Sequence, residues 1–230
     1  MGAAFSFGAS FKTKGPPLAI MVRSKEDSKI MKKSFSDVMK NRRSVYALGK
    51  NSGIKNEAVE SLVKETLDAV PSAFNSQSQR AVVLEGEAHD KLWAIVMSTL
   101  QKLVPADKFA KTEEKIKGFA AAEGTILFFD DEEVTNHLIK AFPLYADNFK
   151  PWAEQQNGML QFAIWSQLEE LGLGVNLQHY NPLIDDQVKA TWGIPQSWRL
   201  RAEMVYGKKL EEPDSRDHQD VNKRFLAFQK

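Results

Sequence analysis

Two adjacent arginines and a serine in residues 41–46, NRRSVY, are the first side chains whose types and spacing suit the binding of an anion. Arg42 and Arg43 each offer a planar fork of hydrogen-bond donors that matches phosphate oxygens, and Ser44 adds a hydroxyl. A charged, solvated helix face explains the same arginines. The stretch alone does not decide between these two interpretations.

A second candidate stretch is residues 71–80, PSAFNSQSQR, in which amide and hydroxyl side chains follow one another with almost no charge. Asn75 and Gln77 each carry a donor and an acceptor, so they can pair with a heteroaromatic ring edge that alternates acceptor, donor and acceptor. A polar connection between a helix and a strand is the other interpretation, and the residues alone leave both open.

Two further stretches place glycines and lysines near predicted strands. In residues 170–182, ELGLGVNLQHYNP, Gly172 and Gly174 allow the backbone to approach a ligand closely, but an ordinary helix C-terminal cap explains them equally well. Neither GxGxxG nor GxxxxGK is present. In residues 206–213, YGKKLEEP, Lys208 and Lys209 follow a predicted strand and complete an anion site or form a basic turn.

Composition excludes several classes of function. The 31 Lys and Arg against 30 Asp and Glu leave a net charge of +1, which disfavours nucleic-acid binding. The chain has no cysteine, so disulfides, thiolate metal sites and thiol nucleophiles are excluded. The 4 histidines lack ligand spacing, and GxSxG and HExxH are absent. Because the chain has no cysteine for thiol redox chemistry, electron transfer would need a cofactor. Because no apolar run is long enough for a membrane span, we expect a cytoplasmic protein.

Helical and strand patterns alternate along the chain after the first thirty residues. The strand at residues 125–131, TILFFDD, lacks alternation between apolar and polar residues, which indicates cover on both faces. We expect one α+β domain over residues 31–230, with strands between helices. The patterns predict a short helix from Ser34 or Ser36, helices over residues 56–70, 87–104, 108–122, 152–171 and 183–193, and strands over 80–86, 125–131, 175–180 and 199–207.

Residues 1–30 differ from the rest of the chain because they contain no acid before Glu26 and show no helical or strand period. We expect a leader or tag that is not part of the fold, with an organellar transit peptide as the alternative.

The order and spacing of these stretches resemble the nitroreductase family of flavoproteins. The resemblance rests on RRS, PSAFNSQSQR, the long helix that ends at GLG, LQHYNP and a late GK, and it extends from about residue 32 to about residue 209. It is greatest to the compact fungal and lactic-acid-bacterial branch. It implies a mixed, mainly antiparallel central sheet flanked by helices. It also implies an intertwined homodimer with FMN at the subunit interface.

The resemblance implies a set of residues for each part of FMN. The phosphate or ribityl chain would be held by Arg42, Arg43, Ser44, Lys208 and Lys209, the pyrimidine edge by Asn75, Gln77 and Ser78, and the ring near N5 by the backbone of Gly172, Leu173 and Gly174.

The activity that the resemblance implies has two half-reactions. NADH or NADPH delivers hydride to flavin N5 and leaves, and a nitroaromatic, quinone or azo acceptor then takes the electrons. Because FMN carries the chemistry, no catalytic side chain is needed. Phe142, Tyr145 and Trp152 are candidates for an aromatic lid. The alternative is an FMN-binding sensor or regulatory module that does not turn over a substrate.

Overall fold

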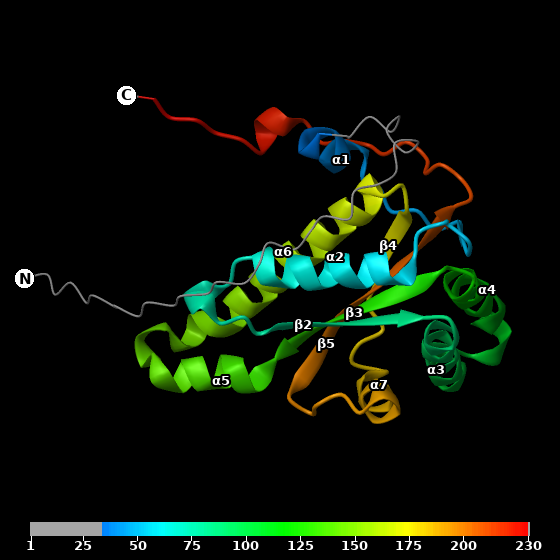
Figure 1. The fold of residues 1–230 in the computed structure, drawn as a ribbon, viewed down its shortest axis with the longest axis horizontal. Helices are drawn as coiled ribbons and strands as arrows, with labels where there is room; N and C mark the ends of the chain where they lie inside the picture. The colour runs from blue at the N-terminus through cyan, green and yellow to red at the C-terminus, as the bar shows by residue number, and fades with distance from the viewer. Residues whose placement is uncertain (1–33, 230) are drawn as a thin grey trace, which may run out of the picture. The chain divides into compact units, whose positions relative to one another are not determined.

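The computed structural model describes residues 34–229, and the leader predicted for residues 1–30 lies outside them. The described chain is an antiparallel sheet with helices on both faces (Figure 1). The helices are α1 (Phe35–Asn41), α2 (Asn56–Ala69), α3 (Glu87–Leu103), α4 (Phe109–Ala120), α5 (Glu132–Ala141), α6 (Ala146–Glu170) and α7 (Asp185–Trp192). The strands are β1 (Leu48–Gly49), β2 (Gln79–Glu85), β3 (Gly124–Asp131), β4 (Gly174–Gln178) and β5 (Trp198–Lys209).

The sheet is built around β5, which pairs with β1, β3 and β4, while β2 pairs with β3 on its other side. Every ladder between these strands is antiparallel. An isolated parallel bridge joins Ser44 to Val175, so that the segment after α1 runs beside β4. The predicted α+β class with a mixed, mainly antiparallel sheet is therefore confirmed.

Each face of the sheet has its own hydrophobic core, as the run of apolar residues in β3 predicts. Ile126 and Phe128 pack with α2 and α6 on one face. Leu127 and Phe129 pack with α3, α4 and α7 on the other. Successive side chains of a strand point to opposite faces, so a strand covered on both sides must be apolar at every position.

Most predicted element boundaries are within two residues of the observed ones, and two of the differences bear on the site. Helix α6 begins at Ala146 rather than residue 152 and contains Pro151 near its start. Strand β5 continues to Lys209, because its last residues pair with the two-residue strand β1. Lys208 and Lys209 therefore lie within a strand and not in a turn after it. No local pattern marks a strand as short as β1.

Candidate functional site

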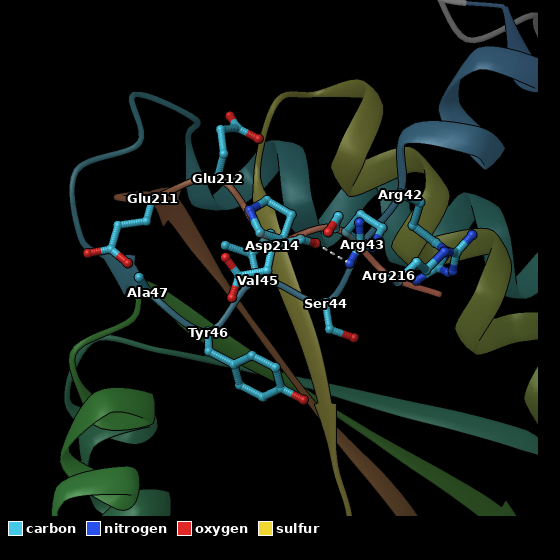
Figure 2. Close-up of a pocket in the computed structure, with 12 residues that line it drawn as sticks. Arg42, Arg43, Ser44, Val45, Tyr46, Ala47, Glu211, Glu212, Asp214 and Arg216 are labelled. Carbon is cyan, nitrogen blue, oxygen red and sulfur yellow. Dashed lines mark hydrogen bonds between the residues drawn. The ribbon is translucent and has the colours of Figure 1, made fainter. Parts of the chain in front are cut away.

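An open cleft of about 440 Å³ lies between two segments that are far apart in the sequence (Figure 2). Residues 42–47, which follow α1, form one wall, and residues 211–216, which follow β5, form the other. A neighbouring groove of about 760 Å³ also includes Arg43 and Arg216, together with Lys40, Lys209 and His218. The two hollows share Arg43 and Arg216, and their walls also carry acids, which are Glu211, Glu212 and Asp214 in the cleft and Glu169 and Glu212 in the groove.

Arg42 is placed by the end of α1, where it is the C-terminal cap residue and its amide bonds to Val38. Its guanidinium lies 4.4 Å from the centre of the Trp165 ring on α6. Its Nε is buried and has no hydrogen-bond partner among the described residues. Burial, and then the charges of Arg216 and Arg43, lowers the pKa of Arg42. An anion placed here would relieve both the unpaired donor and the repulsion between like charges.

Arg43 and Ser44 join the two walls of the cleft to the sheet. Arg43 Nη2 donates to the carbonyl oxygen of Asp214 at 2.6 Å, a bond drawn in Figure 2. The amide of Val45, next to Ser44, donates to the Val175 carbonyl of β4 at 2.9 Å. The backbone after the two arginines is thus held by β4. On the opposite wall of the cleft, the carboxylates of Glu211 and Glu212 point away from the arginines (Figure 2).

Of the two predicted lysines, the structure brings one to the lining of these hollows. Lys209 lines the larger groove and its Nζ pairs with Glu169 of α6 at 2.8 Å. Lys208 is exposed and does not line either hollow. Adjacent strand residues point to opposite faces, which separates the two side chains. Arg216, to which the sequence assigned no role, lies beside Arg42 in the cleft (Figure 2). That Lys208 and Lys209 bind the phosphate stays a prediction.

Asn75 and Gln77 lie exposed in a loop with an unusual backbone. Phe74, Asn75 and Gln77 have φ angles of 55°, 50° and 47°, which is the left-handed region that residues other than glycine rarely adopt. Such conformations cost on the order of 1–3 kcal/mol each and are concentrated at functional sites. The 3₁₀ turn Ala73–Asn75 and the residues after it therefore form a strained loop between α2 and β2. That this loop contacts a ligand stays a prediction.

Ser78, which was grouped with Asn75 and Gln77, is fully buried. Its hydroxyl donates to Asp130 Oδ1 at 2.5 Å and accepts from Gln156 Nε2 at 2.7 Å. Its hydrogen-bonding capacity is used inside the chain, so it supports the loop and does not present its hydroxyl to a ligand.

The three residues of the GLG stretch occupy different environments. Gly172 is exposed, has a φ of +85° and ends α6, as the helix-cap interpretation requires. Leu173 is buried in the core. A Cβ on Gly174 would lie 2.5 Å from Leu48 Cδ2 and 2.9 Å from Lys209 Cγ. Packing within the chain is sufficient to explain the absence of a side chain at Gly174. Contact of its backbone with a ligand stays a prediction.

The predicted lid residues Phe142, Tyr145 and Trp152 gather around one ring that the prediction missed. The Phe74 ring centre lies 4.9 Å from that of Phe142, 5.6 Å from Tyr145 and 6.0 Å from Trp152. Phe149 completes the cluster at 5.3 Å from Phe74. Phe74 is 48% exposed, so the cluster has an open aromatic surface beside Asn75. The aromatic residue inside PSAFNSQ was the available signal.

The two parts of the candidate site contact different stretches of α6, one near its middle and the other near its C-terminal end. The strained loop contacts α6 at Gln156, whereas Arg42 and Lys209 contact it at Trp165 and Glu169. At about 1.5 Å of rise per residue, roughly 14–20 Å of helix separates them.

Within residues 34–229 there is no group of three or more histidine, cysteine, aspartate or glutamate side chains able to hold a metal ion. In the same part of the chain, none of the helices has the length and apolar character needed to cross a membrane.

The antiparallel sheet between helices and the arginine-lined cleft define an α+β protein whose site suits a phosphorylated ligand. A model of the Nitroreductase family matches residues 39–208, which is more than half of the chain. The chain belongs to the nitroreductase family and is by class an oxidoreductase and flavoprotein.

Relatives with the same architecture come from yeast and from a lactic-acid bacterium. HBN1 of Saccharomyces cerevisiae is 35% identical over 77% of this chain and 89% of its own length. The nitroreductase FRM2 of the same yeast is 32% identical over 80% of this chain and 92% of FRM2. The nitroreductase CinD of Lactococcus lactis, solved with chloramphenicol and with 4-nitrophenol, is 44% identical with a TM-score of 0.78, covering 85% of this chain and 100% of CinD.

Proposed function

We propose that this protein is an FMN-dependent oxidoreductase that transfers electrons from NADH or NADPH to nitroaromatic, quinone or related acceptors. The observation that carries the proposal is the basic cleft at Arg42, in a chain that belongs to the nitroreductase family. The cytoplasmic location expected from the sequence stays a prediction.

The residues of the cleft fit the phosphate of FMN. Arg42 has a buried Nε without a partner, and Arg43 and Arg216 crowd it with like charge. A phosphate would accept hydrogen bonds from these guanidinium groups and neutralise their repulsion. Ser44 lies in the same wall and offers a hydroxyl to the phosphate or the ribityl chain.

The loop at Asn75 and Gln77 fits the polar edge of the flavin ring, since both amides are exposed and held on a strained backbone. Because α6 separates this loop from Arg42 by roughly 14–20 Å, we propose that each site combines the loop and the cleft of two protomers in a homodimer.

The aromatic cluster around Phe74 fits the acceptor side of the site. Its partly exposed rings can stack on a planar aromatic compound and exclude water from the reacting face. The relative CinD was solved with chloramphenicol and with 4-nitrophenol, both of which carry a nitro-substituted ring, which supports acceptors of this class.

FMN, when bound, supplies the centre that accepts hydride and passes on electrons, so the protein needs no nucleophilic side chain. The contribution of the chain is to bind the phosphate, to orient the ring edge through Asn75 and Gln77, and to stack the acceptor on the Phe74 cluster. We propose that the oxidised nicotinamide leaves before the acceptor enters, because both use the same open face.

The first test is the visible spectrum of the purified full-length protein. We expect flavin absorbance that bleaches with NADH or NADPH and returns when a quinone or a nitroaromatic compound is added. Steady-state rates should give parallel double-reciprocal lines, as a two-step mechanism requires. Bound flavin that neither nicotinamide reduces would instead identify an FMN-binding module without this activity.

Arg42→Ala tests the phosphate assignment. Hydrogen bonds to charged groups contribute about 1.5–3 kcal/mol, so we expect FMN to bind roughly tenfold to a hundredfold more weakly. Fluorescence titration of the apoprotein measures the Kd. Arg199→Ala is the matched control, because Arg199 is an arginine paired with Glu132 away from the cleft. Equal Kd values for Arg42→Ala and Arg199→Ala would show that the phosphate assignment is wrong.

A further inference from the structure

We propose that Gln156 is a positioning residue that holds residues 72–78 in the shape in which Asn75 and Gln77 meet the flavin ring. The inference rests on the proposed function. It assigns part of the affinity for FMN to a buried amide on α6 that does not itself touch the cofactor.

The hydrogen bonds of the Gln156 side chain all go to this loop. Its Oε1 accepts from the amide of Ala73 at 3.1 Å and from Ser76 Oγ at 3.4 Å. Its Nε2 donates to Ser76 Oγ at 3.2 Å and to Ser78 Oγ at 2.7 Å. The side chain is only 2% exposed, so water cannot replace these partners.

The anchored residues alternate with the strained ones. Gln156 holds Ala73, Ser76 and Ser78, and the left-handed residues Phe74, Asn75 and Gln77 lie between them. A non-glycine residue stays in the left-handed region only where its surroundings favour that conformation over the right-handed one. By bonding to the residues on both sides of each left-handed segment, Gln156 favours the left-handed conformation over the right-handed one.

Two other side chains hold the backbone of Gln77 and leave its amide side chain exposed. The Gln77 amide donates to Ser72 Oγ at 2.9 Å, and its carbonyl accepts from Arg80 Nη1 at 2.5 Å. Arg80 is itself fixed by Asp131 at 2.9 Å. Within residues 73–76, the Gln77 side chain donates a long hydrogen bond to the Asn75 carbonyl, at 3.4 Å. Among the described residues outside the loop, Gln156 is the side chain that bonds to residues 73–76.

Loss of the Gln156 hydrogen bonds should weaken FMN binding in two ways. A loop that relaxes must be ordered again when FMN binds, and this ordering reduces affinity. The amides of Asn75 and Gln77 would also meet the ring edge at altered angles, which changes the environment of the chromophore.

The experiment compares Gln156→Leu with Gln167→Leu in the full chain. Gln167 is also on α6 and its amide bonds to a hydroxyl, Thr66 Oγ1 at 2.6 Å, but on α2 and not on the loop. For Gln156→Leu, we expect hydrogen exchange at Ala73 and Gln77 in the apoprotein to become about tenfold or more faster. We also expect the Kd for FMN to rise about tenfold, and the bands of bound FMN to shift. Gln167→Leu should change none of these three measurements.

A second variant, Ser76→Ala, removes the loop hydroxyl that bonds to Gln156. Because Ser76 is only half-buried, this variant tests the proposal if Gln156→Leu does not fold. It should change the three measurements in the same direction by a smaller factor. Unchanged exchange, or faster exchange with an unchanged Kd, would overturn the role of Gln156 while leaving the proposed function intact. A wild-type protein that binds no FMN would instead refute the proposed function.

Discussion

Gly174 lies where β1, β5 and the segment after α1 meet. A Cβ at this position would come within 2.5 Å of Leu48, 2.9 Å of Lys209 and 3.2 Å of Val45. The sequence offered ligand approach and helix capping as reasons for this glycine. The structure supplies a third reason, which is that the backbone of β4 must pass close to the side chains that hold the basic cleft together.

Gly174→Ala is expected to destabilise the fold by about 1–3 kcal/mol, because the added methyl group overpacks a contact with the buried side chains of Leu48 and Val45. Gly118→Ala is the control, since Gly118 lies in α4 with nothing within 4 Å of the added carbon. Replacing a helical glycine with alanine usually stabilises by roughly 0.5–1 kcal/mol. Urea unfolding measures both changes. Equal effects of the two substitutions would contradict the packing explanation.

Among the elements, β5 combines three strand pairings with a buried acid. Glu203 is fully buried in this strand, and its Oε2 accepts from the amide of Tyr180 at 2.9 Å. Its Oε1 has no partner among the described residues. Burial raises the pKa of Glu203 to about 8, and the nearby Asp185 charge acts in the same direction. Burial, and then the charge of Glu203, raises the pKa of Tyr180 to about 12.

The raised pKa of Glu203 predicts that the protein loses stability as the pH rises. The folded state holds the proton more tightly than the unfolded chain, where the pKa is near 4.5. The contribution is therefore present below pH 4.5 and is lost between there and about pH 8, with a slope of at most about 1.4 kcal/mol per pH unit.

Glu203→Gln should remove this slope, because glutamine does not titrate. Urea unfolding of the wild type and the variant at several pH values between 5 and 8 measures the difference. Asp185, whose pKa burial also raises, titrates in both proteins, so the difference between the two profiles reports Glu203 together with its coupling to Asp185. Parallel pH profiles for the two proteins would show that Glu203 is already ionised in the fold.

For the whole molecule, the division of the site along α6 and the exposed apolar side chains point to assembly. Met159 and Phe162 of α6 are 46% and 39% exposed. Near the C-terminus, Phe225, Leu226 and Phe228 are also exposed, and no part of the chain within residues 34–229 covers them. In the proposed homodimer, a second copy would bury these surfaces and bring its own loop to the arginine cleft.

Light scattering should therefore give a mass of about twice the 25.9 kDa of one chain. Phe162→Glu should dissociate the dimer and release FMN together, because each site would need both protomers. Leu103→Glu is the control, since Leu103 is an exposed apolar residue at the end of α3. A monomer that binds FMN with wild-type affinity would contradict the shared site.

Much of the fold could be predicted from the sequence because it depends on residues that are close together in the chain. The periodic apolar residues of α2 and the unbroken apolar run of β3 set those elements to within two residues. Strand β1 and the end of β5 could not be predicted, since each exists only because the other is present. The start of α6 was missed because Pro151 is typical of a helix boundary.

The sequence by itself determined the family, the α+β class and the stretches that hold the candidate site, because these follow from local residue types and their order. Only the tertiary structure decided which side chains meet. The tertiary structure places Arg216, and not Lys208, in the lining of the cleft. It also buries Ser78 and brings the side chain of Gln156 into hydrogen-bond contact with the PSAFNSQ loop. These contacts join residues far apart in the chain, and their geometry depends on the packing of the whole sheet and its helices.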